Sequence, residues 1–338
     1  GQRALAEVAT GGEAPNAGIL QRGWLAIVAV FLCVACSAVS LPLQAVLMPP
    51  SGTSAVLEHA VDLYTEGRRN EAVEELEALL REKPDHSDAH HLLGSLYLET
   101  GRFEEAATEF GKASVLAPEN GAPHAALARI HYLLDDTEQV ERELVLAVLL
   151  GADDSLTQLL LGDAYLEMRR FGLAEDAYAR SAELTPGSTW SLAGLASSYS
   201  AQGEYEQALK ACETGLETHS EAADMYLSRG YVHLHRGDLE RASEAFSEAA
   251  KLTPERSNVH SALSFVHYLR GDVAESLMEA EEAVRLNPYD GVGHEQLALA
   301  CHARGDLHRA LAAAQEAVRL GPKTDTAYYV LGLCYIDA

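Results

Sequence analysis

Residues 87–120 read SDAHHLLGSLYLETGRFEEAATEFGKASVLAPEN, and this stretch decides the fold. Its spacing of small, apolar and turn residues recurs every 34 residues. The repeats begin at Thr53, Ser87, Gly121, Ser155, Thr189, Ala223, Ser257 and Gly291, and a shorter ninth begins at Asp325. A fixed period of this length is typical of stacked helical hairpins, each of which buries its apolar face against a neighbour. We therefore expect one continuous row of repeats over residues 53–338.

The recurring positions each have a physical reason. Position 8 is small (Gly94, Gly162 and Gly230, for example), and position 20 is usually alanine, so the two helices of a repeat can approach closely. Glycine at position 15 favours the left-handed residue that ends a helix, and proline at position 32 ends the second helix. The glycines at position 15 are Gly67, Gly101, Gly203, Gly237, Gly271 and Gly305.

The motif His90-x-x-Leu93-Gly94-x-x-Tyr97, followed by Gly101, Ala106, Phe110, Ala113 and Pro118, resembles the tetratricopeptide repeat family. His90 stands where that family usually has tryptophan. The resemblance implies an all-α fold: a right-handed superhelix (an α-solenoid) of eight full repeats and a partial ninth. It also implies a protein-binding scaffold in which the first helix of each repeat lines a concave groove through positions 2, 5, 9, 12 and 13.

The charge of the chain is strongly negative. The formal net charge is −26, and residues 1–52 contribute nothing to it because Arg3 and Arg22 balance Glu7 and Glu13. An acidic surface repels nucleic-acid phosphates, so we expect no nucleic-acid partner. The excess charge either keeps the repeats soluble or selects a basic partner.

The front of the chain predicts a membrane anchor. Residues 24–48 carry no charged side chain, and as a helix they would span about 37 Å, more than the hydrocarbon core of a bilayer. We expect a flexible tail (1–22), a transmembrane helix (23–48) and a linker (49–52) before the repeats. The anchor residues we single out are Trp24, Phe31, Leu32 and Leu41.

Two other interpretations of this apolar segment stay open. One is a cleaved signal peptide that ends near Cys36-Ser-Ala38, and the other is a lipoprotein signal with Cys36 as the acylated residue. Arg22 before the segment favours a cytoplasmic N-terminus. The resulting prediction is a single-pass protein of the bacterial inner membrane, with its repeats in the periplasm.

No catalytic or cofactor motif survives inspection, so we predict a protein that is not an enzyme and needs no cofactor or metal. His294-Glu295 lacks the second histidine of a zinc-protease helix. Histidine recurs at position 4 (His90, His124, His260, His294) and position 11 (His131, His233, His267). These histidines either replace aromatic packing residues or, as pairs on one helix face, offer metal ligands.

The predicted contact surface lies in repeats five to seven, where groove positions hold large apolar side chains. The candidates are Trp190, Leu227, Tyr231, Leu234, Phe265, Tyr268 and Leu269. Aromatic side chains in a concave surface suit a helix or extended peptide from a partner. The alternative is that superhelical curvature buries them between neighbouring repeats. Arg129 is the only basic groove residue found in the first half.

A second predicted docking edge is the start of the ninth repeat, at Tyr328, Tyr329 and Leu333, which no following helix in this sequence covers. From these features we predict a membrane-tethered scaffold that forms part of a protein complex. Two alternatives are an envelope or secretion assembly factor that binds exported chains, and the docking arm of an enzyme whose catalytic domain lies beyond Ala338.

Overall fold

The computed structural model describes residues 55–65, 68–151, 153–320 and 325–337, and these residues form seventeen helices and no strand. The first helix of each repeat, helix A, is one of α4 (Ala55–Thr65), α6 (Ser87–Glu99), α8 (Ala122–Leu133), α10 (Ser155–Glu167), α12 (Thr189–Gln202), α14 (Ala223–Arg236), α16 (Ser257–Arg270), α18 (Gly291–Arg304) and α20 (Asp325–Asp337). The second, helix B, is one of α5 (Arg69–Glu82), α7 (Phe103–Leu116), α9 (Thr137–Leu150), α11 (Phe171–Leu184), α13 (Tyr205–Thr218), α15 (Leu239–Leu252), α17 (Val273–Leu286) and α19 (Leu307–Leu320). The predicted all-α fold of stacked helical hairpins is therefore confirmed for the described residues.

Five of the predicted turn glycines, Gly101, Gly203, Gly237, Gly271 and Gly305, adopt the left-handed backbone that the sequence predicts for them. Gly203, Gly237, Gly271 and Gly305 end their A helices with φ between 82° and 84°. In some repeats the following helix starts on a side-chain cap; for example, the carboxylate of Asp238 accepts a hydrogen bond from Arg241 N. Such a cap satisfies a backbone N–H that the start of the helix would otherwise leave unpaired.

The core is built where a ring of helix B meets the small residue at position 8 of helix A. The Phe110 ring lies against Gly94, where an added Cβ would be 3.1 Å from the ring. Tyr178 and Phe246 occupy the same position against Gly162 and Gly230 and are almost fully buried. Close packing of this kind makes the small residue necessary.

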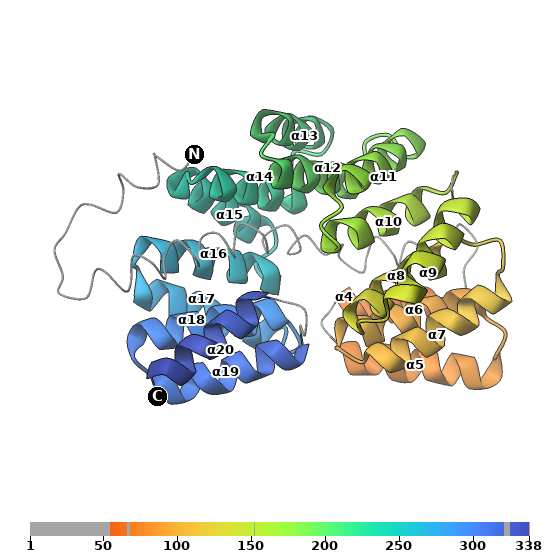
Figure 1. The fold of residues 1–338 in the computed structure, drawn as a ribbon, viewed down its shortest axis with the longest axis horizontal. Coiled ribbons are helices and arrows are strands. Elements are labelled where there is room, and N and C mark those ends of the chain that lie inside the picture. Colours follow the sequence, from red (N-terminus) through yellow and green to blue (C-terminus); the bar gives the residue numbers. More distant parts are fainter. Residues whose placement is uncertain (1–54, 66–67, 152, 321–324, 338) are drawn as a thin grey trace.

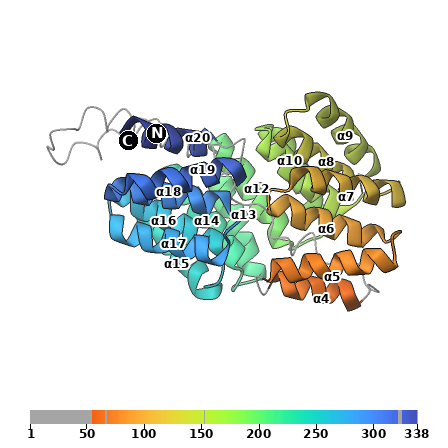
Figure 2. The ribbon, with the colours of Figure 1, turned by 90° about the horizontal axis from the view of Figure 1, so that it is seen from below.

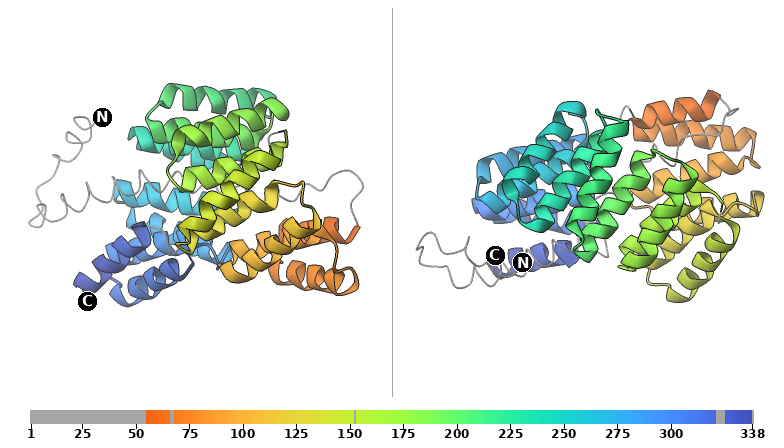
Figure 3. Two further views of the ribbon diagram at one scale, coloured as in Figure 1. Left: turned by 45° about the vertical axis from the view of Figure 1, so that its right-hand side comes forward. Right: turned by 90° about the horizontal axis from the view of Figure 1, so that it is seen from above.

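The row of repeats curves into an arch (Figure 1). Repeats 1–3 form one side, repeats 7–9 the other, and repeats 4–6 join them, as the other views also show (Figures 2 and 3). The two sides meet where a Cβ built on Gly101 would lie 3.5 Å from Leu320 Cδ2. The end of helix α6 therefore lies close to the end of α19.

The predicted single-pass membrane localisation is wrong for the part of the chain that the structure describes. None of its helices is long and apolar enough to cross a membrane. The B helices have 14 residues, for example α19, and would extend only about 21 Å. The predicted tail, anchor and linker (1–22, 23–48 and 49–52), with Trp24, Phe31, Leu32 and Leu41, lie outside the described residues.

Candidate protein-binding face

The A helices form the inner line of the arch. Successive A helices contact one another from α8 to α14 and from α16 to α20. The B helices make their main contacts with A helices of the same or the next repeat, and few with one another. Elements that come closest from one repeat to the next lie at the smaller radius of a solenoid. We call this side, made by positions 2, 5, 6, 9, 12 and 13 of the A helices, the inner face.

Four of the predicted groove residues are not available on this surface. Leu227, Tyr231, Leu234 and Phe265 are buried, with at most 7% of each residue exposed. The Tyr231 ring packs edge-on against Phe246, with ring centroids 5.0 Å apart. The prediction of an exposed apolar cluster is therefore wrong at these four positions, because their side chains belong to the core of repeats 6–9.

The other three predicted residues are half-buried. Trp190 packs against the core of repeats 4 and 5, while Tyr268 and Leu269 pack against that of repeats 6–9. Each leaves part of its side chain accessible. Their role in binding a partner stays a prediction.

The predicted C-terminal edge contains both accessible and buried side chains. Tyr328 is 53% exposed, and Tyr329 and Leu333 are half-buried. Their neighbours Val330 and Cys334 are buried in the core. Helix α20 thus packs on α19 through one face and presents Tyr328 on another.

Polar contacts link the A helices of neighbouring repeats along the inner face. Tyr64 Oη donates to both Glu99 oxygens, at 2.8 and 2.7 Å. Arg129 pairs with Glu167 at 2.6 Å, and this is the basic residue that the sequence singled out. Further along, Ser200 Oγ and His235 Nδ1 lie 2.6 Å apart.

Burial raises the pKa of two carboxylates on the inner face. Burial raises the pKa of Asp163 to about 7, although Arg129 is nearby and Tyr178 Oη donates to the carboxylate at 2.6 Å. Burial likewise raises the pKa of Glu99. The dominant cause in both cases is loss of solvation of the charged form.

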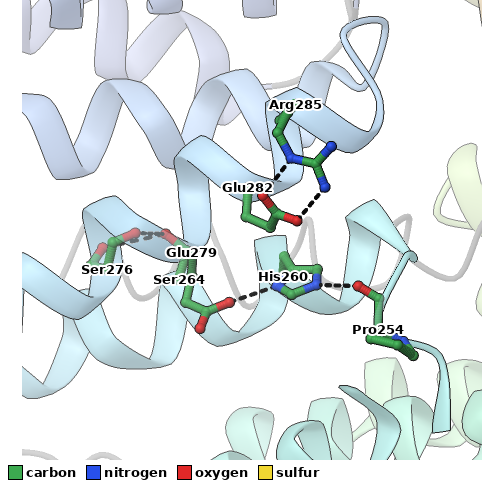
Figure 4. Close-up of polar contacts among 7 residues, drawn as sticks. All are labelled: Pro254, His260, Ser264, Ser276, Glu279, Glu282 and Arg285. Carbon is green, nitrogen blue, oxygen red and sulfur yellow. Dashed lines mark hydrogen bonds and ion pairs between the residues drawn. The ribbon is translucent and has the colours of Figure 1, made fainter. Parts of the chain in front are cut away.

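The histidines at position 4 make a contact that the sequence interpretation missed. His260 Nδ1 lies 2.7 Å from Glu279 Oε2, and its Nε2 donates to the Pro254 carbonyl at 2.8 Å (Figure 4). One imidazole therefore joins helix A, helix B and the last turn of the preceding repeat. The Glu279 hydrogen bond raises the pKa of His260.

The same contact recurs in other repeats. His90 pairs with Glu109 at 2.5 Å and with the Pro84 carbonyl at 2.9 Å, and His124 pairs with Glu143 at 2.6 Å. His294 bonds the Pro288 carbonyl, but position 23 of its repeat is Ala313. The signal was present in the sequence, because glutamate stands at position 23 in the three repeats that pair it with a position-4 histidine.

These histidines do not form metal sites with other ligands. Among the described residues, no group of three or more His, Cys, Asp or Glu side chains could hold a metal ion. His131 and His267, at position 11, face Asp136 and Asp272 at 3.7 and 3.4 Å. The geometry of the described part is that of pairwise polar contacts between helices.

A family model of the tetratricopeptide repeat matches residues 57–125, 194–257, 236–291 and 296–338, which is more than half of the chain. The chain belongs to the tetratricopeptide repeat family. No curated protein matches its sequence. Membership supports the general function of these repeats, which is to hold protein partners on preformed helices.

Solved tetratricopeptide structures share the fold at low identity. The crystal structure of the APC/C hetero-tetramer Cut9-Hcn1 is similar with 14% identity and a TM-score of 0.55, over 87% of this chain and 57% of that one. This tetratricopeptide chain thus spans little more than half of that relative. A tetratricopeptide repeat protein from Parabacteroides merdae ATCC 43184 is similar with 16% identity and a TM-score of 0.53, over 72% of this chain and 97% of that one.

Proposed function

We propose that this protein is a scaffold that binds a protein partner on the inner face of its A helices and performs no chemistry itself. The observation that carries the proposal is the inner line of A helices, which contact one another from α8 to α14 and from α16 to α20 and are linked by polar contacts such as Tyr64–Glu99 and Arg129–Glu167. Preformed helices bind without a large ordering cost. The edge at Tyr328 is a second contact point, and a role as a subunit of a protein complex fits the fold.

Half-buried aromatic side chains give the partner its apolar anchors in this proposal. One part of each side chain, Trp190 and Tyr268, packs against the core and another part is accessible, so each can contact a partner while it stays packed. Replacing the buried Tyr231 or Phe265 would instead damage the fold. Experiments on binding therefore have to use Trp190, Tyr268 and Tyr328.

Site-specific photo-crosslinking tests this assignment. A photoreactive amino acid replaces Trp190, Tyr268 or Tyr328, and the matched control positions are the exposed outer residues Val145 and Met278. We expect the same protein to be crosslinked from the inner positions in an extract of the source cells, and not from Val145 or Met278. Equal crosslinking from both sets would contradict the inner-face assignment, and none from any position would contradict the scaffold function.

A further inference from the structure

Helix α9 has an apolar outer side in its second half. Residues 144–150 read LVLAVLL, without one charged or polar side chain. Val145, Val148 and Leu149 of this stretch are 64%, 47% and 72% exposed. Residues three and four apart lie on one side of a helix, so these three side chains form a single apolar surface. We call Val145, Val148 and Leu149 the α9 patch.

No other B helix of the chain has this composition. Positions 25–29 of every other repeat contain at least one charged side chain, whereas those of repeat 3 contain none. Position 29, which holds Leu149, is charged in the six repeats that have Arg81, Glu183, Glu217, Lys251, Arg285 and Arg319 there. Repeat 2 has Val115 at position 29, together with Lys112 at position 26. A helix that is apolar on all sides is normally buried on all sides, so the α9 patch differs from apolar residues exposed singly.

Nothing in the described part of the chain covers the α9 patch. Helix α9 lies at the outer edge of the molecule, as Figure 2 shows. Among the described helices, α9 contacts the A helix that follows it, α10, less than any other B helix contacts its successor. The patch thus faces water in a single copy of the chain, and packing it against another apolar surface would lower the free energy.

The charged groups at the two ends of the patch differ in sign. Arg142, one turn before the patch, is exposed and has no hydrogen-bond or ion-pair partner among the described residues. Its neighbour Glu141 already pairs with Arg170. The turn after α9 carries Asp153, whose side chain is 88% exposed although it pairs with Arg180 at 2.8 Å. An unpaired cation therefore precedes the patch, and an acidic turn follows it.

This arrangement is complementary to a second copy of itself in the antiparallel direction. Arg142 lies three residues before Val145, and Asp153 lies four residues after Leu149. When two α9 helices pack antiparallel about a two-fold axis through the patch, apolar side chains meet apolar side chains. Arg142 of each copy then lies opposite the Asp153 turn of the other. A two-fold contact of this kind needs only one surface and is the commonest arrangement of homodimers.

We propose that the α9 patch is a dimerisation surface, on which a second copy of this chain packs its own α9 antiparallel and pairs Arg142 with Asp153. The net charge of −26 makes copies repel one another, so an uncharged surface is where they can approach. The patch is smaller than the roughly 800 Å² per partner of a stable interface, so we expect a weak dimer. Because α9 is a B helix, the dimer leaves the inner face free and joins two such faces in one assembly.

Sedimentation velocity of the full chain over a range of concentrations tests the proposal. We expect a monomer–dimer equilibrium with a Kd on the order of 1–100 µM. Val145→Glu/Leu149→Glu should raise this Kd at least about tenfold, because it places carboxylates against one another in an apolar contact. A chain that stays monomeric at about 100 µM would overturn the proposal.

The matched control is Thr214→Glu/Met278→Glu, which adds the same charge at exposed positions of α13 and α17. We expect less than about a threefold rise in Kd, because salt screens charges that are far from the contact. Circular dichroism checks that both double variants keep their helices. An equal rise in Kd for the two variants would overturn the proposal, since general repulsion would then explain the effect.

An exchange of charges tests the antiparallel arrangement and leaves the apolar side chains in place. Arg142→Glu and Asp153→Arg should each weaken self-association about threefold or more, because like charges then lie opposite each other. An equimolar mixture of the two variants should form a heterodimer with about the wild-type Kd. One of its contacts joins the two introduced charges and the other keeps the native pair. If native mass spectrometry showed no preference for the heterodimer, the proposal would be overturned.

The dimer and the proposed scaffold function can fail separately. A photoreactive amino acid at Val145 should crosslink to a second copy of this chain, whereas one at Trp190 or Tyr268 should crosslink to the partner protein. Crosslinking of Val145 to the partner alone would overturn the dimer and leave a scaffold function standing. Crosslinking between copies at Val145, with no partner captured from the inner face, would support the dimer and contradict the scaffold function.

Discussion

Repeats 3 and 4 turn from helix A to helix B with different residues from repeats 6–8. Their turn residues are Asp135 (φ 64°) and Arg169 (φ 59°), whereas repeats 6–8 have Gly237, Gly271 and Gly305, each with φ 84°. A side chain in the left-handed region costs roughly 1 kcal/mol. Both regions need a positive φ at this turn, and the conformation costs more free energy where the residue has a side chain.

The hairpins are nonetheless the same in both regions. The backbone N–H that follows the turn residue bonds a carbonyl five residues earlier: Asp136 N to His131 O at 2.9 Å in repeat 3, and Asp238 N to His233 O at 2.9 Å in repeat 6. The turn residue thus does not decide the hairpin. Repeats 4 and 6, one from each region, share close contact between the helices at positions 8 and 24, where Tyr178 lies against Gly162 and Phe246 against Gly230. We infer that this packing holds the turn even where glycine is missing.

The largest predicted effect tests that shared packing. In Gly162→Ala (repeat 4) or Gly230→Ala (repeat 6), the new methyl group would overlap the ring of Tyr178 or Phe246. We expect each change to cost about 1–3 kcal/mol of unfolding free energy, as overpacking does. Urea unfolding followed by circular dichroism measures the loss.

The control for this prediction is Gly111→Ala in α7, where an added Cβ meets nothing within 4 Å. Alanine favours a helix over glycine, so we expect a gain of up to about 1 kcal/mol. If Gly230→Ala behaved like Gly111→Ala, contact at position 8 would not be what holds the hairpins, and the comparison between the two regions would need another cause.

The next largest effect is expected from substitutions of the turn residues themselves. Asp135→Gly and Arg169→Gly should each stabilise their repeats by roughly 1 kcal/mol, and Gly237→Ala and Gly271→Ala should destabilise theirs by a similar amount. Amide hydrogen exchange of the flanking helices resolves such local changes in a solenoid. If Asp135→Gly did not slow amide exchange in α8 and α9, the positive φ of Asp135 would not destabilise the turn.

The sequence predicts the helices and turns of this molecule but not how exposed its side chains are. Helices, turns and register depend on the 34-residue period, and the positions of Gly94, Gly237 and Pro254 sufficed to predict them. The accessibility of Leu227, Tyr231 and Phe265 was not predicted, because it depends on how closely neighbouring A helices pack. A one-dimensional pattern gives the positions that share a face, and the curvature of the stack then decides how much of that face stays open.

The candidate site was predicted only in part for a related reason. Arg129 was recognised as an isolated base, but its partner Glu167 is 38 residues away, in the next repeat. The pairing of a position-4 histidine with a position-23 glutamate was also missed, because contacts between two helices are invisible to a search along one helix. Aligning the repeats beneath one another would have revealed both.

The smallest predicted effect concerns that pairing, in repeats 7 and 8. Because the hydrogen bond to Glu279 raises the folded-state pKa of His260, the pair contributes stability that is fully present below the unfolded value of 6.5. The contribution is lost as pH rises through the folded value. Glu279→Gln should therefore speed amide exchange in α16 and α17 near pH 6, by an amount equivalent to roughly 1 kcal/mol or less given the partial exposure, and have less effect near pH 9.

Repeat 8 offers the converse experiment, because His294 already bonds the Pro288 carbonyl and position 23 of its repeat is Ala313, where repeat 7 has Glu279. Ala313→Glu should give α18 and α19 the pH dependence that repeat 7 has, with slower exchange near pH 6 than near pH 9 once the intrinsic rates are divided out. The buried position makes the uncompensated carboxylate costly at high pH, so the sign of the effect should reverse there. A loss of protection that is equal at both pH values would show that the imidazole does not charge in response to the carboxylate, and that the histidines at position 4 act only by packing.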